Sequence, residues 1–464
     1  MNKSRKSRPI SAARRLALDI LRRVEAEGAF ASLAIDNALR RHPGLSVADR
    51  GLVTQLVYGT LRWRRRLDWA LAAHSSRPLE RIEPQLLRIL RLTAFQLLML
   101  DRVPDFAAVD EGTSLAVSLR GKRAGGFVNA VARGLAQARD RIELPDPERN
   151  LVRHLAVVHS FPSWMVRMWL DGFGRERAEA LMNACNQPAP LWLRSNTLKG
   201  PPARLLELLS ASGMSAEPSK LVPAAIRLDG ARDIASLAAH EAGWLHVQDA
   251  GAQAVCHLVG ARPGERVLDA CAAPGGKSAT LAQLMEGQGE LLAVDRNPAR
   301  LGLVRKLADR LGLSMIERMV GDLVDLDADE LGQFDRVLLD APCSALGVLR
   351  RHPEGKWRLA AEDIERMARV QAELLDAASR LVKPGGVLVY SICTLSRAEG
   401  PDLLSHWLGE HPAFHIEDPR DQKRAPWHKL LAADGTLATW PDLNDMDGFF
   451  AARLRRAPEP GGRS

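Results

Sequence analysis

The chain has few cysteines and no long apolar segment. Its five cysteines are an odd number, and they do not form the C-x-x-C pairs of a zinc site, so neither a disulfide framework nor a metal centre is expected. No run approaches the ~20 apolar residues of a membrane helix, and the N-terminus lacks the apolar stretch of a secretory signal. These absences favour a soluble protein of the reducing cytoplasm, without a membrane partner.

Positive charge is concentrated at the start of the chain. Residues 1–150 contain 27 lysines and arginines against 16 acidic residues, a net charge of +11, while the whole chain carries +8. A concentrated positive field is typical of proteins that bind a phosphate backbone, although basic helical faces are often only solvated. The run from Arg62 to Arg66 places Trp63 among four arginines, which favours RNA over bulk solvent.

The basic region has helical periodicity throughout. Apolar residues recur at three-to-four spacing over 12–26, 52–72, 84–100 and 109–119, with proline or glycine between the segments. We therefore predict an all-α bundle. The 464 residues and their 46% hydrophobic content allow two to three domains, each with its own core.

A strand, a tight turn and a helix are predicted over 267–285. Apolar residues end at Asp269, and small residues, Pro274 and two glycines lead into a helical segment. A phosphate-binding loop would need glycine where Cys271 stands, and the three spaced glycines of a dinucleotide fingerprint are missing. Either a turn that holds S-adenosylmethionine or an ordinary strand-to-helix connection fits this segment.

Three further predicted strands also end at aspartate. The predicted strands 290–295 and 334–340 end at Asp295 and Asp340, and another apolar run reaches Asp322. Helical segments such as 298–311 separate them. Carboxylates at the ends of parallel strands line the crevice of a doubly wound α/β sheet. Asp295 lies about 20 residues after the glycines, where a nucleotide-binding fold places the carboxylate that accepts ribose hydroxyls.

Three motifs in the C-terminal half of the chain resemble those of one family. The segment 271–277 is similar to its cofactor signature, 340–357 to its long catalytic loop, and 390–394 to its second cysteine motif. The family is the RNA (cytosine-5)-methyltransferases, and the resemblance is to the Sun (Fmu, RsmB) group that acts on 16S ribosomal RNA. The helical region resembles the RNA-binding antitermination factor NusB, with 126–133 similar to its closing helix.

The resemblance implies a domain order and a set of cofactor residues. We expect a NusB-like all-α RNA-binding domain over 1–145, a small α/β linking subdomain over 146–240, a Rossmann-like methyltransferase domain over 241–456 and a tail over 457–464. The expected substrate is 16S ribosomal RNA, the cofactor is S-adenosyl-L-methionine, and the protein is expected to be monomeric without a metal. The cofactor-binding residues expected are Cys271, Ala272, Ala273, Pro274, Gly275, Gly276, Lys277, Asp295, Asp322 and Asp340.

Two cysteines are candidates for covalent catalysis. Carbon 5 of cytosine is a poor nucleophile until a thiolate adds to carbon 6 and turns the ring into an enamine. Cys343 and Cys393 each follow a predicted strand, and their spacing does not decide which one attacks. The resemblance implies that Cys393 attacks and Cys343 assists product release, whereas DNA methyltransferases use the Pro-Cys cysteine. It also implies that Asp340 holds N3 of the base.

The second cysteine motif departs from the family pattern. Ile392 and Thr394 stand where Thr and Ser are usual, which puts the local hydrogen bonding in question, and Gly400 replaces a frequent Asn. Transfer RNA is an alternative substrate, and an RNA-binding assembly factor without catalysis is an alternative function. The residues expected to contact RNA are Arg62, Arg64, Arg65, Arg350, Arg351 and Lys356.

Overall fold

A computed structural model describes residues 10–230, 234–421 and 424–459. The chain forms two compact units, one of residues 1–186 and 351–358 and one of 187–350 and 359–464. Within the described ranges, no helix is both long and apolar enough to cross a bilayer. This division into two units cuts the expected linking subdomain. Its residues 146–186 belong to the first unit, and its residues 187–240 belong to the second.

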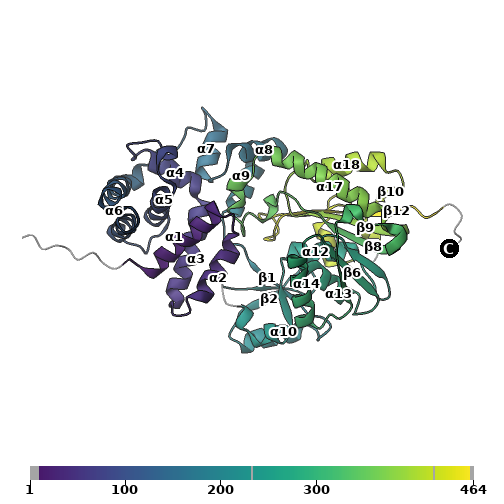
Figure 1. Ribbon diagram of the computed structural model, residues 1–464. Helices are drawn as coiled ribbons and strands as arrows, with labels where there is room; N and C mark the ends of the chain where they lie inside the picture. Colours follow the sequence, from purple (N-terminus) through teal and green to yellow (C-terminus); the bar gives the residue numbers. More distant parts are fainter. Residues whose placement is uncertain (1–9, 231–233, 422–423, 460–464) are drawn as a thin grey trace, which may run out of the picture. The chain divides into compact units, whose positions relative to one another are not determined.

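The first unit is helical, as predicted (Figure 1). Its helices before residue 140 bury apolar residues in a shared core that includes Leu21, Leu56, Leu90 and Leu135. The predicted helix over 52–72 is two helices, because the backbone leaves helical geometry at Trp63 (φ −100°, ψ 12°). The helices are α1 (Ala12–Ala26), α2 (Ala31–Arg41), α3 (Val47–Arg62), α4 (Arg64–Ala72), α5 (Pro84–Met99), α6 (Asp105–Ala138), α7 (Leu151–Val158), α8 (Ser163–Phe173) and α9 (Arg175–Cys185).

Residues 351–358, which come from the middle of the second unit's sequence, complete this helical unit. The segment ends in the short helix α16 (Gly355–Arg358). Its side chains bond to helix ends: the Trp357 indole donates to the carbonyl of Leu61 at 2.6 Å, and Arg358 donates to that of Ala29 at 2.6 Å. Glu354 accepts the amide of Ala31 at 3.0 Å.

Lys356 is the central residue of this segment, and it is fully buried. Its ammonium donates to the carbonyls of Arg62 and Ser160 and to Asn186 Oδ1, at 3.3, 3.2 and 2.7 Å. It also lies 3.5 Å from the centroid of the Phe161 ring. Burial lowers the pKa of Lys356 well below its ordinary value. The lysine therefore ties together the ends of three helical segments from the inside.

The second unit contains a small antiparallel sheet of strand order β2-β3-β1-β4. Its apolar face, with Leu193, Ile226 and Leu245, packs with Leu205 and Leu209 of helix α10. The elements are β1 (Leu191–Ser195), α10 (Pro202–Ala211), β2 (Ala216–Pro218), β3 (Ala225–Leu228), α11 (Ala238–Glu241) and β4 (Leu245–Val247).

The large sheet of this unit has the order β10-β12-β9-β8-β5-β6-β7, and β11 also pairs with β12. Strands β5 to β9 are parallel, while β10, β11 and β12 pair antiparallel. The predicted doubly wound, mostly parallel sheet is confirmed. Its strands are β5 (Arg266–Asp269), β6 (Glu290–Asp295), β7 (Ile316–Val320), β8 (Phe334–Asp340), β9 (Val382–Ile392), β10 (Phe414–Ile416), β11 (Leu437–Thr439) and β12 (Phe449–Arg456).

Helices cover both faces of this sheet, so alternate residues of its central strands enter two different cores. Val267 and Leu338 belong to one core, and Leu268 and Leu339 to the other. Figure 1 shows α17 and α18 on one side of β8 and β9 and α12 to α14 on the other. These helices are α12 (Ala250–Val259), α13 (Gly276–Leu284), α14 (Pro298–Leu311), α17 (Glu362–Arg380) and α18 (Pro401–Glu410); the short α15 (Ala328–Leu331) precedes β8.

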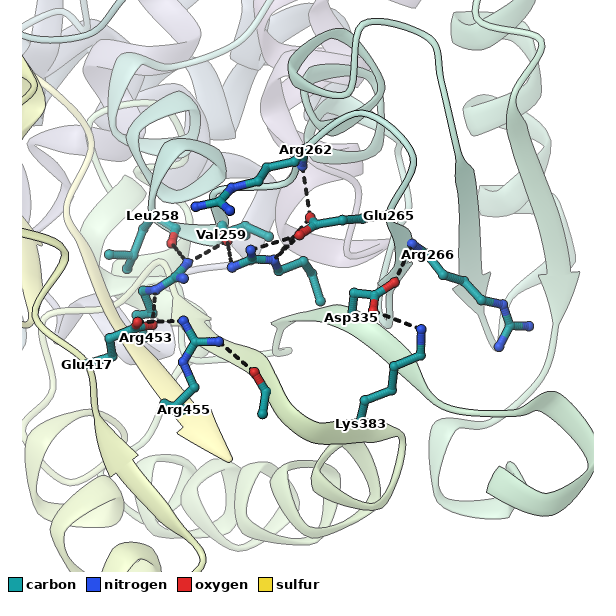
Figure 2. A network of polar contacts seen from close by, with 12 residues as sticks. Leu258, Val259, Arg262, Glu265, Arg266, Asp335, Lys383, Glu417, Arg453 and Arg455 are labelled. Carbon is teal, nitrogen blue, oxygen red and sulfur yellow. Dashed lines mark hydrogen bonds and ion pairs between the residues drawn. The ribbon is translucent and has the colours of Figure 1, made fainter. Parts of the chain in front are cut away.

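A polar network stabilises the edge where the parallel strands begin (Figure 2). Arg453 is buried, and it donates to the last carbonyls of α12, those of Leu258 and Val259, at 2.9 and 2.6 Å. Glu417 joins the guanidinium groups of Arg453 and Arg455 at 2.6 and 2.5 Å. Arginines at a helix C-terminus satisfy free carbonyls, so this edge is structural.

Glu417→Gln is expected to lower the stability of the second unit by roughly 1.5–3 kcal/mol, the contribution of hydrogen bonds to charged groups. Burial would raise the pKa of Glu417, but Arg455 and Arg453 outweigh it and lower that pKa. A carboxylate with a lowered pKa stabilises the fold above its unfolded pKa, and that contribution is lost as pH falls through the folded pKa. Urea unfolding at pH 7 measures the loss of stability in Glu417→Gln. The same measurement at pH 4 should show a smaller difference between the variant and the wild type. Glu410→Gln, whose side chain is 63% exposed, is the control and should change little.

Candidate active site

The candidate active site lies at the opposite edge of the sheet, where the parallel strands end. Strand β5 has β6 on one side and β8 on the other, so the strand order reverses direction at β5. Ligands of doubly wound sheets bind at such a switch point, outside the carboxyl ends of the strands. The predicted cofactor turn follows β5, and both candidate cysteines follow the neighbouring strands β8 and β9.

The turn between β5 and α13 requires glycine at Gly275. This residue has a φ of +102°, and a Cβ there would lie 2.9 Å from Cα of Val304 in α14. Its amide donates to the carbonyl of Ala272 at 2.7 Å. Helix α13 begins at Gly276, and the first amides of a helix have no helical acceptors and favour negative groups. Ala272 and Ala273 are buried, and Pro274 is exposed.

The four strand-end aspartates surround Cys271. Burial, together with the charges of the four aspartates Asp340, Asp269, Asp295 and Asp322, raises the pKa of the Cys271 thiol to about 12. Burial, together with the nearby carboxylates, also raises the pKa of Asp269 to about 7, although Ser278 donates to it at 2.6 Å. The predicted gathering of acidic groups at this edge is thus present in the structure, and it creates a negative region suited to a cationic ligand.

Asp295 is positioned to hold a hydroxyl-bearing ligand beside the turn. Its two carboxylate oxygens accept the amides of Ala273 and Asn297 at 3.2 and 2.9 Å. Each carboxylate oxygen has two lone pairs, so one acceptor position per oxygen remains for a ligand hydroxyl. Asp322, two residues after the end of the next strand, β7, accepts the amide of Val324 at 3.3 Å. The residues present therefore fit a nucleoside with a positively charged substituent.

Lys277 forms an ion pair with Asp340, which the sequence did not predict. The Lys277 ammonium donates to Asp340 Oδ2 at 2.6 Å, and the Ser391 hydroxyl donates to Oδ1 at 3.2 Å. Burial would lower the pKa of Lys277, but the Asp340 carboxylate outweighs burial and raises that pKa above its ordinary value. The pair thus places a permanent cation and a carboxylate beside the two cysteine loops.

The thiols of Cys343 and Cys393 lie 3.4 Å apart. Parallel pairing of β8 with β9 sets Asp340 opposite Ser391, so the loops that follow the two strands start side by side. Residues fifty positions apart in sequence are therefore neighbours at the sheet edge. Both cysteines are half-buried, which leaves them open to a substrate while limiting their contact with water.

The contact between the two thiols affects the pKa of Cys343. The hydrogen bond with Cys393, followed by burial and the nearby charges, raises the pKa of Cys343 well above its ordinary value. A thiolate is the nucleophilic form of cysteine, so this raised pKa counts against Cys343 as the attacking group.

The residues expected to contact RNA occupy different environments. Arg62, Arg64, Arg65 and Arg351 are half-buried, and the Arg65 guanidinium donates to Ser163 Oγ at 2.9 Å. Arg350 is buried and pairs with Asp445 at 2.8 Å, so most of its charge is already used within the fold. Lys356 is enclosed, and its ammonium is not available to a phosphate in this conformation. Arg64 lies over the ring of Trp357, with its Cζ 5.4 Å from the centroid.

Sequence reasoning missed the residues that connect the cysteine loops. Ser344 Oγ and Thr394 Oγ1 lie 2.7 Å apart, and both bond to the buried carboxylate of Glu399. The hydroxyl in question is absent at Ile392, which is buried in the sheet, whereas the hydroxyl of Thr394 bonds to Glu399. The only sequence signal was that Ser344 and Thr394 each follow a candidate cysteine.

Models of three known families match successive parts of the chain. A model described as 16S rRNA methyltransferase RsmB/F matches residues 257–455, the NusB family matches 11–137, and an RsmF/B-like ferredoxin-like domain matches 161–235. The probable ribosomal RNA small subunit methyltransferase B of Bacillus subtilis is 35% identical over 96% of this chain and 98% of its own. The ribosomal RNA small subunit methyltransferase B of Vibrio vulnificus is 33% identical over 95% of this chain and 98% of its own.

Solved structures share the fold. The crystal structure of PH0851 has a TM-score of 0.82 at 25% identity and covers 97% of this chain and 100% of that chain. A methyltransferase homolog from Pyrococcus horikoshii has a TM-score of 0.58 at 27% identity, covering 66% of this chain and 99% of its own. NSun6 from Pyrococcus horikoshii, solved with the S-adenosylmethionine analogue SFG, has a TM-score of 0.58 at 22% identity, covering 65% of this chain and 100% of its own.

Proposed function

Because the chain belongs to the 16S rRNA methyltransferase RsmB/F family, it is a ribosomal RNA methyltransferase, and we propose that it methylates carbon 5 of a cytosine in 16S ribosomal RNA. The observation that carries the cytosine-5 assignment is the pair of thiols, 3.4 Å apart, beside Asp340 at the cofactor edge of the sheet. A pyrimidine carbon that must be activated, methylated and then released needs both a nucleophile and a proton acceptor at neighbouring ring atoms.

The proposed reaction assigns one step to each side chain. The Cys393 thiolate forms a bond to carbon 6, and the electron pair of the carbon 5–carbon 6 double bond is placed at carbon 5. S-adenosylmethionine supplies the methyl group as a sulfonium, whose leaving group is a neutral thioether. The carbon 5 proton is then transferred to Cys343, which acts as a thiolate base at this step. The electron pair of the carbon–hydrogen bond re-forms the carbon 5–carbon 6 double bond, and the bond from carbon 6 to Cys393 breaks to release the Cys393 thiolate. Asp340, fixed by Lys277 and Ser391, is assigned to the N3 side of the base, where a hydrogen bond makes carbon 6 more electrophilic.

The cofactor is assigned to the turn between β5 and α13. Asp295 would hold the ribose hydroxyls, Asp322 the adenine, and the first turn of α13 the negative end of the methionine group. The RNA backbone is assigned to the basic helical unit, with Arg62, Arg64, Arg65 and Arg351 as the residues with exposed surface.

Methylation of isolated 16S ribosomal RNA and of small subunits by the purified protein tests the proposal. Bisulfite sequencing of ribosomal and transfer RNA should show a protected cytosine in 16S RNA that is absent without the protein. Protection in transfer RNA alone would assign the other substrate. Methyl transfer to RNA without a bisulfite-resistant cytosine would disprove the cytosine-5 assignment.

Asp295→Ala is expected to weaken S-adenosylmethionine binding by ~10- to 100-fold, since hydrogen bonds to a charged group contribute about 1.5–3 kcal/mol. RNA affinity should be unchanged, because Asp295 lies at the cofactor turn. Calorimetry with each ligand measures both constants. Asp309→Ala, on the exposed face of α14, is the matched control. Unchanged cofactor affinity in Asp295→Ala would remove this residue from the site.

A further inference from the structure

The loops that carry Cys343 and Cys393 share one buried carboxylate, that of Glu399. It accepts the backbone amide of Ser344 at 2.8 Å and the Ser344 hydroxyl at 2.5 Å, from the first loop. It accepts the Thr394 hydroxyl at 3.3 Å, from the second loop. Ser344 directly follows Cys343, and Thr394 directly follows Cys393, so the carboxylate bonds to the residue next to each thiol.

Helix α17 adds a third support to the same carboxylate. Gln371 donates to Glu399 Oε1 at 3.0 Å and also to the carbonyl of Pro342, just before Cys343, at 2.9 Å. The Tyr390 hydroxyl donates to the Glu399 carbonyl at 2.6 Å. Glu399 is fully buried, and all donors to its carboxylate within the described residues are neutral. A buried charge without a cation is costly unless hydrogen bonds satisfy it, so a role in the site explains its presence better than stability does.

We propose that Glu399 is the positioning residue of this site, whose carboxylate locks the two cysteine loops together so that both thiols reach the same pyrimidine ring. The role of this arrangement in catalysis rests on the proposed cytosine-5 reaction. The hydrogen bonds that hold the two loops together do not depend on that reaction and can be tested without substrate. A neutral amide would keep only one acceptor oxygen, so the Ser344 and Thr394 hydroxyls, which donate to Oε2, would have to reorient and accept from its NH₂ group instead. The charge of Glu399 is also among the causes that raise the pKa of Cys343.

The distance between the thiols can be probed without RNA or cofactor. Phenylarsine oxide condenses with two neighbouring thiols, forming two arsenic–sulfur bonds and releasing water. The wild-type protein should take up one arsenical per chain by intact mass spectrometry, and Cys343→Ala and Cys393→Ala should each abolish uptake. Glu399→Gln should need a concentration at least ~10-fold higher, because the Ser344 and Thr394 hydroxyls lose the charged acceptor that joins the two loops. Glu373→Gln, an exposed glutamate on α17, should behave as wild type.

Methylation kinetics give the second readout. Glu399→Gln should lower kcat with little change in KM for RNA, since loop register affects the reacting atoms and not the distant phosphate contacts. Should Glu399→Gln fail to fold by circular dichroism, Ser344→Ala removes one hydroxyl bond to the carboxylate and should show the same two effects more weakly. Wild-type arsenical uptake and kcat in folded Glu399→Gln, or in Ser344→Ala, would overturn the proposal. A wild-type protein that binds the arsenical but makes no 5-methylcytosine would refute the proposed reaction. The comparison of arsenical uptake between wild type and Glu399→Gln would then decide by itself whether Glu399 holds the two loops together.

Discussion

Cys393→Ala should abolish methylation, with a loss on the order of 10⁴–10⁶-fold, as when a covalent nucleophile is removed. Cys343→Ala should instead form the covalent bond to RNA but fail to release the product. Its Cys393 thiolate still attacks and the ring is still methylated, but the group that assists release is absent. A protein–RNA adduct should therefore accumulate and survive denaturing electrophoresis.

Incubation of each variant with 16S RNA and S-adenosylmethionine, followed by a denaturing gel, makes this comparison. The double variant Cys343→Ala/Cys393→Ala is the control and should show neither adduct nor product. The raised pKa of Cys343, which counts against it as the attacking thiolate, motivates the assignment. An adduct in Cys393→Ala and none in Cys343→Ala would reverse the roles.

Lys356→Ala should destabilise the helical unit by about 3–5 kcal/mol, the range for large-to-small changes and for breaking buried polar networks. The substitution leaves the acceptors of Arg62, Ser160 and Asn186 without their shared donor and opens a cavity beside Phe161. Denaturant-dependent amide exchange, followed on α3 and α9, should detect the change in this unit separately from the second unit.

The same variant separates the structural role of Lys356 from the RNA contact predicted from the sequence. A phosphate contact would leave stability unchanged and reduce the salt slope of RNA binding by about one unit. Lys122→Ala, an exposed lysine of α6, is the control for stability and should stay within ~0.5 kcal/mol. A stable Lys356→Ala with a shallower salt slope would contradict the placement described here.

The spacing of apolar residues, together with the residues that mark the ends of helices and strands, predicted most of the fold. The segments 290–295, 298–311 and 334–340 match β6, α14 and β8 residue by residue, because an aspartate, a proline or a glycine marks their ends. Helix α2 was missed, since its apolar face is short and exposed residues interrupt it. The break at Trp63 was also missed, because α3 and α4 continue the same apolar spacing across it.

The site was predictable where strand ends decide it. The four aspartates and both cysteines follow strands, and parallel strands present their ends at one edge, so their convergence follows from the order of elements. The Lys277–Asp340 pair and the Glu399 carboxylate depend on loop conformations, which no periodic pattern records. Lys356 was misread for a similar reason: a lysine among arginines and a tryptophan has the composition of an RNA contact, and only tertiary packing shows that its ammonium faces inward.

The placement of residues 351–358 has a consequence for synthesis of the chain. The helical unit is made first, yet its last buried piece follows Asn186 by about 165 residues, a delay on the order of 10–30 s at 5–20 residues per second. During that interval the carbonyls of Arg62 and Ser160 lack the Lys356 ammonium, and the unit remains open where the segment will enter. The first unit to leave the ribosome thus reaches its final form only after β8 of the second unit has been translated.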